Sequence, residues 1–101
     1  MKISEVADRM SMDLKVKITE SMIRHYDNIK LIPITRKVNG FRDITDKEYA
    51  LLCNAVILSE LGYGLEEVRK LLREKNGALI VEVRSALNRK IVWVKHILNI
   101  L

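Results

Sequence analysis

The stretch from Ile18 to Ile44 places the tightest limits on the fold of this chain of 101 residues. Thr19 is a favourable N-cap residue, and Glu20 follows in the first turn, where the helix dipole favours an acid. The expected buried side of this helix comprises Met22, Ile23, Tyr26 and Ile29. Pro33 cannot continue a helix, so the sequence predicts a short helix that ends before this proline.

A hairpin is predicted directly after the proline. Asn39-Gly40 is the strongest short-range hairpin signal, and it lies between two expected strands, Ile34–Val38 and Phe41–Ile44. The basic side chains of this hairpin are Arg36, Lys37 and Arg42. A short helix followed by a basic hairpin is typical of a winged helix-turn-helix, which uses both elements to hold duplex DNA.

Another helix should precede this stretch. Ser4 is expected to cap it, and the helix should run from Glu5 to about Met12. The polar segment Asp13–Lys17 then reads as a loop or short extension. Its Lys15 and Lys17 are candidates for contacts with the DNA backbone.

Two more helices are predicted after the hairpin. The segment Thr45–Glu48 has the spacing of a capping box and opens a helix through Leu61. Gly62 ends that helix by permitting a left-handed backbone conformation. A fourth helix is expected over Leu65–Lys75, closed by Asn76-Gly77.

The last segment, Ala78–Leu101, contains no glycine or proline and at ~1.5 Å per residue spans roughly 36 Å as one helix. Its apolar stripe, interrupted by Arg84, has 3-4 spacing. The stripe comprises Ile80, Leu87, Ile91, Val94, Leu98 and Leu101. A domain over residues 1–77 is too small to cover it, so we expect the same helix of a second chain to pair with it antiparallel as a coiled coil. The sequence thus predicts a DNA-binding domain over residues 1–77 and a dimerisation helix over residues 78–101.

Charge is distributed unevenly along the chain, whose net charge is +5. Residues 14–42 hold seven basic and two acidic side chains, whereas residues 43–67 hold one lysine and six acids. A basic face beside an acidic one indicates an oriented binder of a polyanion.

Cys53 is the only cysteine, which excludes a disulfide within the chain and a multi-cysteine metal site. With no apolar run near ~20 residues and no signal peptide, we expect a cytoplasmic, nucleoid-associated protein and no membrane partner.

Four ordered motifs resemble the MerR family of bacterial transcription regulators. The recognition-helix motif of that family appears as Arg24-His25-Tyr26-Asp27, and its Gly-Leu-Leu/Ile-x-Pro turn as Lys30-Leu31-Ile32-Pro33. Its wing motif appears as Asn39-Gly40-Phe41-Arg42-Asp43-Ile44. Its later Leu-Gly-Phe motif appears as Leu61-Gly62-Tyr63, continuing to Val68. The motifs cover about half the chain, and the order of elements agrees over nearly all of it.

The resemblance implies a mainly α fold, a winged helix-turn-helix followed by a long dimerisation helix, and a sequence-specific regulator that binds double-stranded DNA as a homodimer. The DNA-binding residues that it implies, together with the basic candidates above, are Lys15, Lys17, Thr19, Ser21, Arg24, His25, Tyr26, Arg36, Lys37 and Arg42. The resemblance further leads us to expect a minimal form without an effector domain, and therefore no effector sensing. Neither a cofactor nor a metal is expected. RNA polymerase or another protein stays open as a further partner.

Several positions depart from the family pattern. Lys30 stands where the family has glycine, so this turn must form without a positive φ or with strain. His25 and Ile44 replace tyrosines. The turn between the first two helices is about six residues longer than expected, filled by Ser11–Lys17, and is able to re-aim the recognition helix.

Two other functions stay open, and enzymatic catalysis does not. The chain has no nucleophile paired with a base, no glycine-rich phosphate loop and no carboxylate pair in an evident pocket. One alternative is an architectural, excisionase-like protein that bends DNA. The other is a MerR-like fold that now binds a protein partner, with its acidic face around Glu60, Glu66 and Glu67 as the contact surface.

Overall fold

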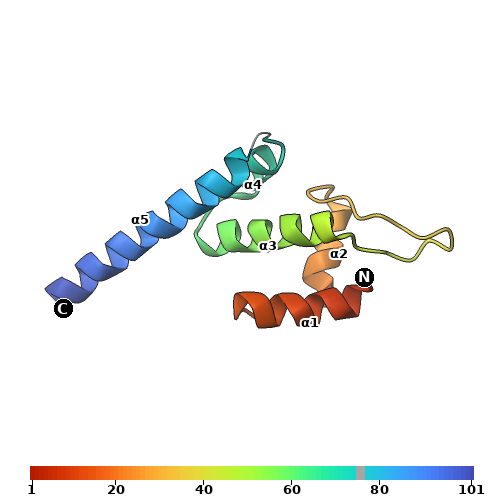
Figure 1. The fold of residues 1–101 in the computed structure, drawn as a ribbon, viewed down its shortest axis with the longest axis horizontal. Coiled ribbons are helices and arrows are strands. Elements are labelled where there is room, and N and C mark those ends of the chain that lie inside the picture. Colours follow the sequence, from red (N-terminus) through yellow and green to blue (C-terminus); the bar gives the residue numbers. More distant parts are fainter. Residues whose placement is uncertain (75–76) are drawn as a thin grey trace. The chain divides into compact units, whose positions relative to one another are not determined.

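The computed structural model describes residues 1–74 and 77–101, and its secondary structure in these ranges is mainly helical (Figure 1). The helices are α1 (Ile3–Leu14), α2 (Glu20–Asn28), α3 (Asp46–Glu60), α4 (Leu65–Leu72) and α5 (Ala78–Ile100). The chain forms two compact units, Met1–Asn54 and Ala55–Leu101, which divide within α3. Within the described ranges, no helix has the length and apolar character needed to cross a membrane.

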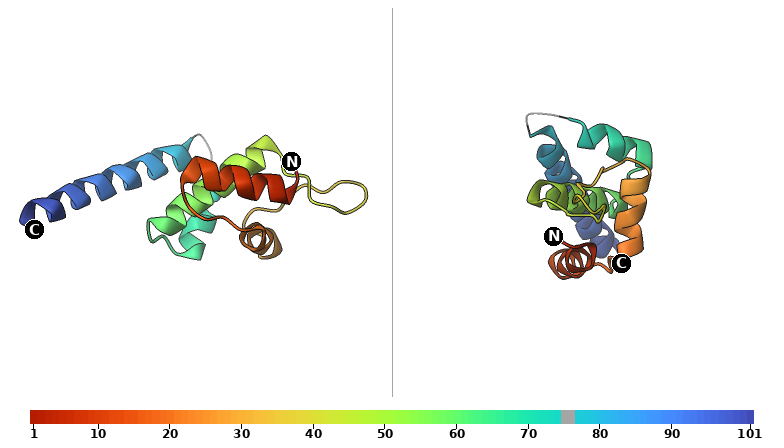
Figure 2. Two further views of the ribbon diagram at one scale, coloured as in Figure 1. Left: turned by 90° about the horizontal axis from the view of Figure 1, so that it is seen from below. Right: turned by 90° about the vertical axis from the view of Figure 1, so that its right-hand side faces the viewer.

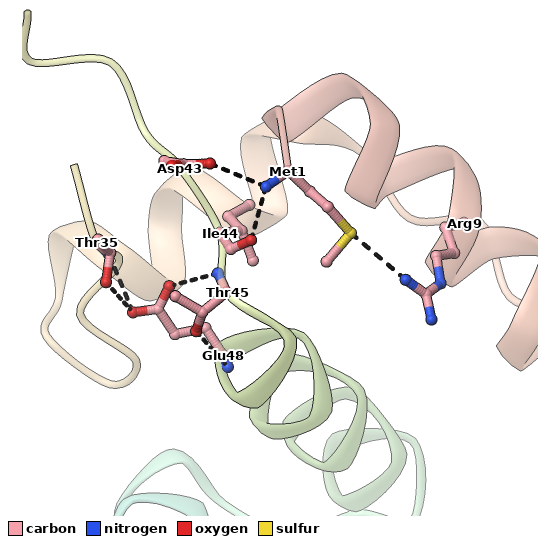
Figure 3. Close-up of polar contacts among 7 residues, drawn as sticks. All are labelled: Met1, Arg9, Thr35, Asp43, Ile44, Thr45 and Glu48. Atoms are coloured by element: carbon pink, nitrogen blue, oxygen red, sulfur yellow. Dashed lines mark hydrogen bonds and ion pairs between the residues drawn. The ribbon is translucent and has the colours of Figure 1, made fainter. Parts of the chain in front are cut away.

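Helix α1 is longer at both ends than the sequence predicts. It begins at Ile3, after Lys2, so Ser4 lies inside the first turn and the predicted serine cap is wrong. The reason is a tertiary contact: the Met1 amino group donates to the Ile44 carbonyl at 2.8 Å (Figure 3), and the Ile44 N–H donates back to the Met1 carbonyl at 2.9 Å. At its other end α1 continues to Leu14, so part of the expected long loop is helical.

Helix α2 begins where the sequence predicts. The Thr19 hydroxyl accepts a hydrogen bond from the Met22 N–H at 3.2 Å, which confirms this threonine as the N-cap. Ile23 is buried, whereas Met22, Tyr26 and Ile29 are only half-buried. Helices α1 and α2 pack against each other and cross, as a helix-turn-helix requires (Figures 1 and 2). The apolar core of this unit comprises Val6, Ala7, Met10, Ile18, Ile23, Leu31, Ile32, Ile34, Ile44, Tyr49 and Leu52.

The wing is a hairpin, but it has less strand pairing than predicted. In the described chain, strand-like pairing is limited to an isolated antiparallel bridge between Arg36 and Arg42. Its loop also differs, because the Gly40 N–H donates to the Lys37 carbonyl and the Lys37 N–H to the Phe41 carbonyl. The loop therefore has three residues, 38–40, rather than an Asn-Gly pair alone. Gly40 takes the left-handed position with φ +88°, as a type I turn with a following bulge requires.

The expected capping box at the start of α3 is confirmed. The Thr45 N–H donates to Glu48 Oε1 at 3.0 Å, and the Glu48 N–H donates to the Thr45 hydroxyl at 3.1 Å. The other oxygen of Glu48 accepts from the N–H and the hydroxyl of Thr35, at 3.0 and 2.7 Å (Figure 3). Glu48 thus ties the first arm of the wing to α3 through the N–H and hydroxyl of Thr35, while the Thr35 carbonyl accepts the Asp43 N–H of the second arm at 2.7 Å.

The second unit holds the end of α3, helix α4 and helix α5. Gly62 has φ +93°, and the Tyr63 N–H donates to the Leu58 carbonyl, which confirms the predicted left-handed cap. Helix α4 ends at Leu72, whereas the predicted helix end and its Asn76 stop lie at residues 75–76, outside the described residues. Helices α4 and α5 pack together. Buried side chains of this unit are Ala55, Val56, Leu58, Val68, Val83 and Ala86.

Helix α5 forms over the predicted range and carries a long exposed apolar surface. All six residues of the predicted dimerisation stripe are exposed, from 40% at Leu87 and Val94 to 95% at Leu101. Val83 and Ala86, which are buried, lie in the N-terminal half of the helix. Contiguous apolar exposure of this extent marks an interaction surface.

Candidate nucleic-acid interface

All ten predicted DNA-binding residues lie in the unit formed by residues 1–54. Eight of the side chains are exposed, and Tyr26 and Arg42 are half-buried. Arg24, His25 and Asn28 face outward from α2 as predicted. The Thr19 hydroxyl also has a structural role, because it caps the helix.

Four of the ten residues line a single basic groove of about 550 Å³. They are Arg24 of α2 and Arg36, Lys37 and Arg42 of the wing. The groove also contains Lys2, Ile3 and Ser4 from the start of α1 and Asn39, Gly40 and Phe41 from the wing. Recognition helix, wing and first helix therefore surround one cationic concavity, an arrangement suited to an anionic polymer.

Sequence reasoning missed the part of this groove that α1 contributes. Lys2 and Ser4 precede the recognition helix by about a full helix, and nothing local in the sequence places them beside the wing. Phe41 is 72% exposed on the wing, and its place in the Asn-Gly-Phe-Arg motif was the available signal for it. Conversely, six of the predicted residues do not line this groove: Lys15, Lys17, Thr19, Ser21, His25 and Tyr26. The two exposed lysines lie beyond the end of α1 instead.

A buried carboxylate joins the recognition helix to the wing. The Asp27 carboxylate of α2 accepts three hydrogen bonds. They come from the Ile34 N–H at 3.0 Å, from an Arg36 guanidinium nitrogen at 3.0 Å and from Arg42 Nε at 2.7 Å. Arg42 also donates to Asn28 Oδ1 at 3.3 Å, and Arg36 to the Gly40 carbonyl at 3.1 Å. Both wing arginines therefore have protein partners as well as a place in the groove.

The environment of Asp27 keeps it ionised. Burial by itself raises the pKa of this carboxyl, but hydrogen bonds from the Ile34 N–H and Arg42, with the charges of Arg42 and Arg36, lower it below its ordinary value. Leaving one member of a buried ion pair without its partner costs about 3–5 kcal/mol. Arg42 is 17% exposed and Asp27 is 3% exposed at their side chains, so this pair should persist.

Arg24 is held more weakly. Its guanidinium lies 3.2 Å from Glu20, four residues earlier on α2, and both side chains are exposed, at 46% and 43%. Exposed helical pairs of this kind contribute only about 0.3–0.5 kcal/mol. A phosphate or a base edge can therefore replace Glu20 as the partner of Arg24 at little cost.

The fold and the basic groove agree with a match to a known family. The sequence model of the MerR helix-turn-helix family of regulatory proteins matches residues 1–75. This chain belongs to the MerR family. As a MerR-family protein it is a DNA-binding regulator of the helix-turn-helix type. The predicted fold, a MerR-like helix-turn-helix followed by a long helix, is confirmed.

Solved MerR-family structures share this fold. HiNmlR, described as a MerR-family regulator lacking the sensor domain and bound to promoter DNA, is 19% identical with a TM-score of 0.72, covering 98% of this chain and 82% of that one. A MerR-family transcriptional regulator from Bacillus cereus is 20% identical with a TM-score of 0.62, covering 99% and 73%. At these low identities the likeness establishes the fold alone.

A third neighbour is MtaN, the N-terminus of the Bacillus subtilis multidrug transporter activator. It is 23% identical with a TM-score of 0.62, and the alignment covers 99% of this chain and 93% of that one. Among curated proteins, no sequence matches the chain.

Proposed function

We propose that this MerR-family protein is a transcription regulator that binds a specific double-stranded DNA sequence as a homodimer in the cytoplasm, without catalysis or a cofactor. The observation that carries the proposal is the basic groove shared by α1, α2 and the wing. The DNA-bound neighbour HiNmlR supports duplex DNA as the ligand. The ten predicted residues form the DNA-binding surface, in which α2 reads base edges and the wing and adjacent lysines contact phosphates.

The homodimer is proposed from the state of α5. The stripe formed by Ile80, Leu87, Ile91, Val94, Leu98 and Leu101 is exposed along the helix and has coiled-coil spacing. Antiparallel pairing of two such helices covers both stripes at once. In this arrangement residues 1–77 act as the DNA-binding domain and residues 78–101 as the dimerisation helix. The two DNA-binding domains of the dimer then bind two half-sites.

Selection of bound sequences from a random duplex pool tests sequence specificity directly. A single enriched palindrome is expected, because a two-fold dimer reads two equal half-sites. Several phased sites would favour an architectural, excisionase-like protein instead. No enrichment together with no duplex binding at low salt would contradict the proposal and favour a protein partner.

Replacement of Arg24 tests which part of the surface reads sequence. Arg24→Ala should weaken binding to the selected duplex by about 1–3 kcal/mol while leaving binding to an unrelated duplex little changed, as expected for a base contact. Fluorescence anisotropy with both duplexes measures this difference. Lys37→Ala is the matched control, because loss of a phosphate contact weakens both duplexes alike. If Arg24→Ala instead lost equal affinity for the two duplexes, Arg24 would be a contact to the DNA backbone.

A further inference from the structure

Among the described residues, Asp27 is notable because it is charged and yet 2% exposed. Its three hydrogen-bond donors all follow Pro33 in the chain and belong to the wing segment: the Ile34 N–H, Arg36 and Arg42. The two arginines are also the bridge pair of the hairpin. One carboxylate on the recognition helix therefore fixes both arms of the wing at the point where they pair.

We infer that Asp27 is a positioning residue for DNA binding, with Arg42 as its structural partner and Arg36 as the wing arginine that contacts a phosphate. The inference rests on the proposed function and refines it, because it reassigns Arg42 from a phosphate contact to a support for the wing. Arg42 is 17% exposed and donates to both Asp27 and Asn28. Both arginines line the basic groove, but the Arg36 side chain is 46% exposed.

Simple electrostatics predicts the opposite effect for Asp27. Removing a negative charge from a surface that binds a polyanion strengthens binding, and each freed arginine that reaches a phosphate steepens the salt dependence by about 0.9. If Asp27 positions the wing, its loss weakens binding instead, because the wing no longer holds Arg36 and Lys37 beside α2. The sign of the change in affinity thus separates the two roles.

The first experiment measures Asp27→Asn binding to the selected duplex by fluorescence anisotropy over a range of salt concentrations. Asparagine keeps an oxygen for the Ile34 N–H but loses the charge that holds the arginines. We expect affinity to fall about tenfold, the equivalent of one charge-assisted hydrogen bond. Glu20→Gln is the matched control, since it neutralises an exposed acid on the same helix and should leave affinity unchanged or raise it. Equal or tighter binding by Asp27→Asn would overturn the inference.

The second experiment is a double-mutant cycle. Arg42→Gln should weaken binding in the wild-type background and add little in the Asp27→Asn background, because both changes break the same contact. Arg36→Gln should lower the salt slope by about 0.9 where the wing is intact. If Arg42→Gln lowers affinity and slope equally in both backgrounds, Arg42 contacts a phosphate itself and the inference fails.

Hydrogen exchange tests the wing without DNA. The Lys37 and Asp43 amides, which donate across the hairpin to Phe41 and Thr35, should lose protection in Asp27→Asn while the amides of α3 keep theirs. Unchanged protection would contradict a positioning role. If Asp27→Asn does not fold, the hydrogen-exchange experiment uses Arg42→Gln instead, because that variant leaves Asp27 with two hydrogen-bond donors. A wild-type protein that binds no duplex defeats the proposed function, whereas the exchange result still reports whether Asp27 holds the wing.

Discussion

Two lysines adopt a backbone conformation that L-residues rarely take. Lys15 has φ +56° and Lys30 has φ +59°, both in the left-handed region. Lys30 occupies the turn position where the MerR pattern has glycine, so the turn forms with a positive φ and a strained residue. Lys15 ends α1, and its N–H donates to the Ser11 carbonyl at 3.1 Å. Each lysine places its Cβ close to the following carbonyl oxygen, at a cost of roughly 1–2 kcal/mol.

Glycine at Lys15 should therefore stabilise the protein. Relief of the Cβ contact outweighs the greater chain entropy of glycine in the unfolded state, so we expect Lys15→Gly to raise the free energy of unfolding by about 0.5–1 kcal/mol. Lys17→Gly is the matched control: it lies in the same connection, removes the same charge and has no positive φ. Thermal unfolding by circular dichroism measures both. A Tm that rises equally in the two variants, or falls in Lys15→Gly, would refute strain at this residue.

At the scale of elements, side-chain contacts to the helices hold the wing more than its own strand pairing does. Its two arms share one bridge, and an isolated two-stranded hairpin is marginal in water. Asp27 holds the arginines of both arms from α2, while Glu48 holds Thr35 from α3. Glu48 also completes the capping box of α3. The orientation of the wing thus depends on two carboxylates that must be ionised.

Acid should loosen this arrangement. Burial raises the pKa of Glu48, but its bonds from Thr45 and Thr35 outweigh that effect and lower the pKa below its ordinary value. A carboxyl with a lowered pKa in the folded state contributes stability above its unfolded pKa, and this stability is lost as pH falls through the folded pKa. We therefore expect Tm to fall as pH is lowered from about 5 towards 2.

Glu48→Gln should make the fall in Tm over this range shallower, because the variant has one ionisable group fewer that binds a proton on unfolding. Part of the pH dependence of Tm should remain in this variant, since the pKa of Asp27 is also lowered in the folded protein. The control is Glu60→Gln, which changes an exposed side chain at the end of the same helix. A pH dependence of Tm that is identical in Glu48→Gln and the wild type would contradict the role given to this carboxylate.

At the scale of the whole molecule, each unit carries one half of the proposed function. Residues 1–54 hold the basic groove, and residues 55–101 hold the exposed stripe of α5. The described part of a single chain contributes this one basic groove, whereas specific recognition of a palindrome needs two copies of it. The affinity for a full site should therefore depend on the apolar stripe, although none of its residues lies in the unit that carries the groove.

Ile91→Asp should dissociate the dimer and weaken binding to the full palindrome while leaving binding to a half-site little changed. Burial of one unpaired carboxylate per chain in the seam is strongly unfavourable. Val92→Asp is the matched control, because Val92 is the next residue on α5, is 68% exposed and points about 100° away. Sedimentation velocity gives the oligomeric state. A wild-type monomer, or a variant Ile91→Asp that stays dimeric, would refute the predicted stripe.

Taken by itself, the sequence determined the order of helices, the caps at Thr19, Thr45 and Gly62 and the place of the wing loop. These features depend on contacts within a few residues, so short motifs report them. Only the tertiary structure decided the early start of α1, the place of Lys2 in the basic groove and the burial of Asp27. Those features depend on residues far apart in sequence that fold against one another, and no periodicity records such contacts. The wing shows both effects. Asn39-Gly40 predicted its turn, whereas the directions of Arg36 and Arg42 depend on the Asp27 carboxylate of α2.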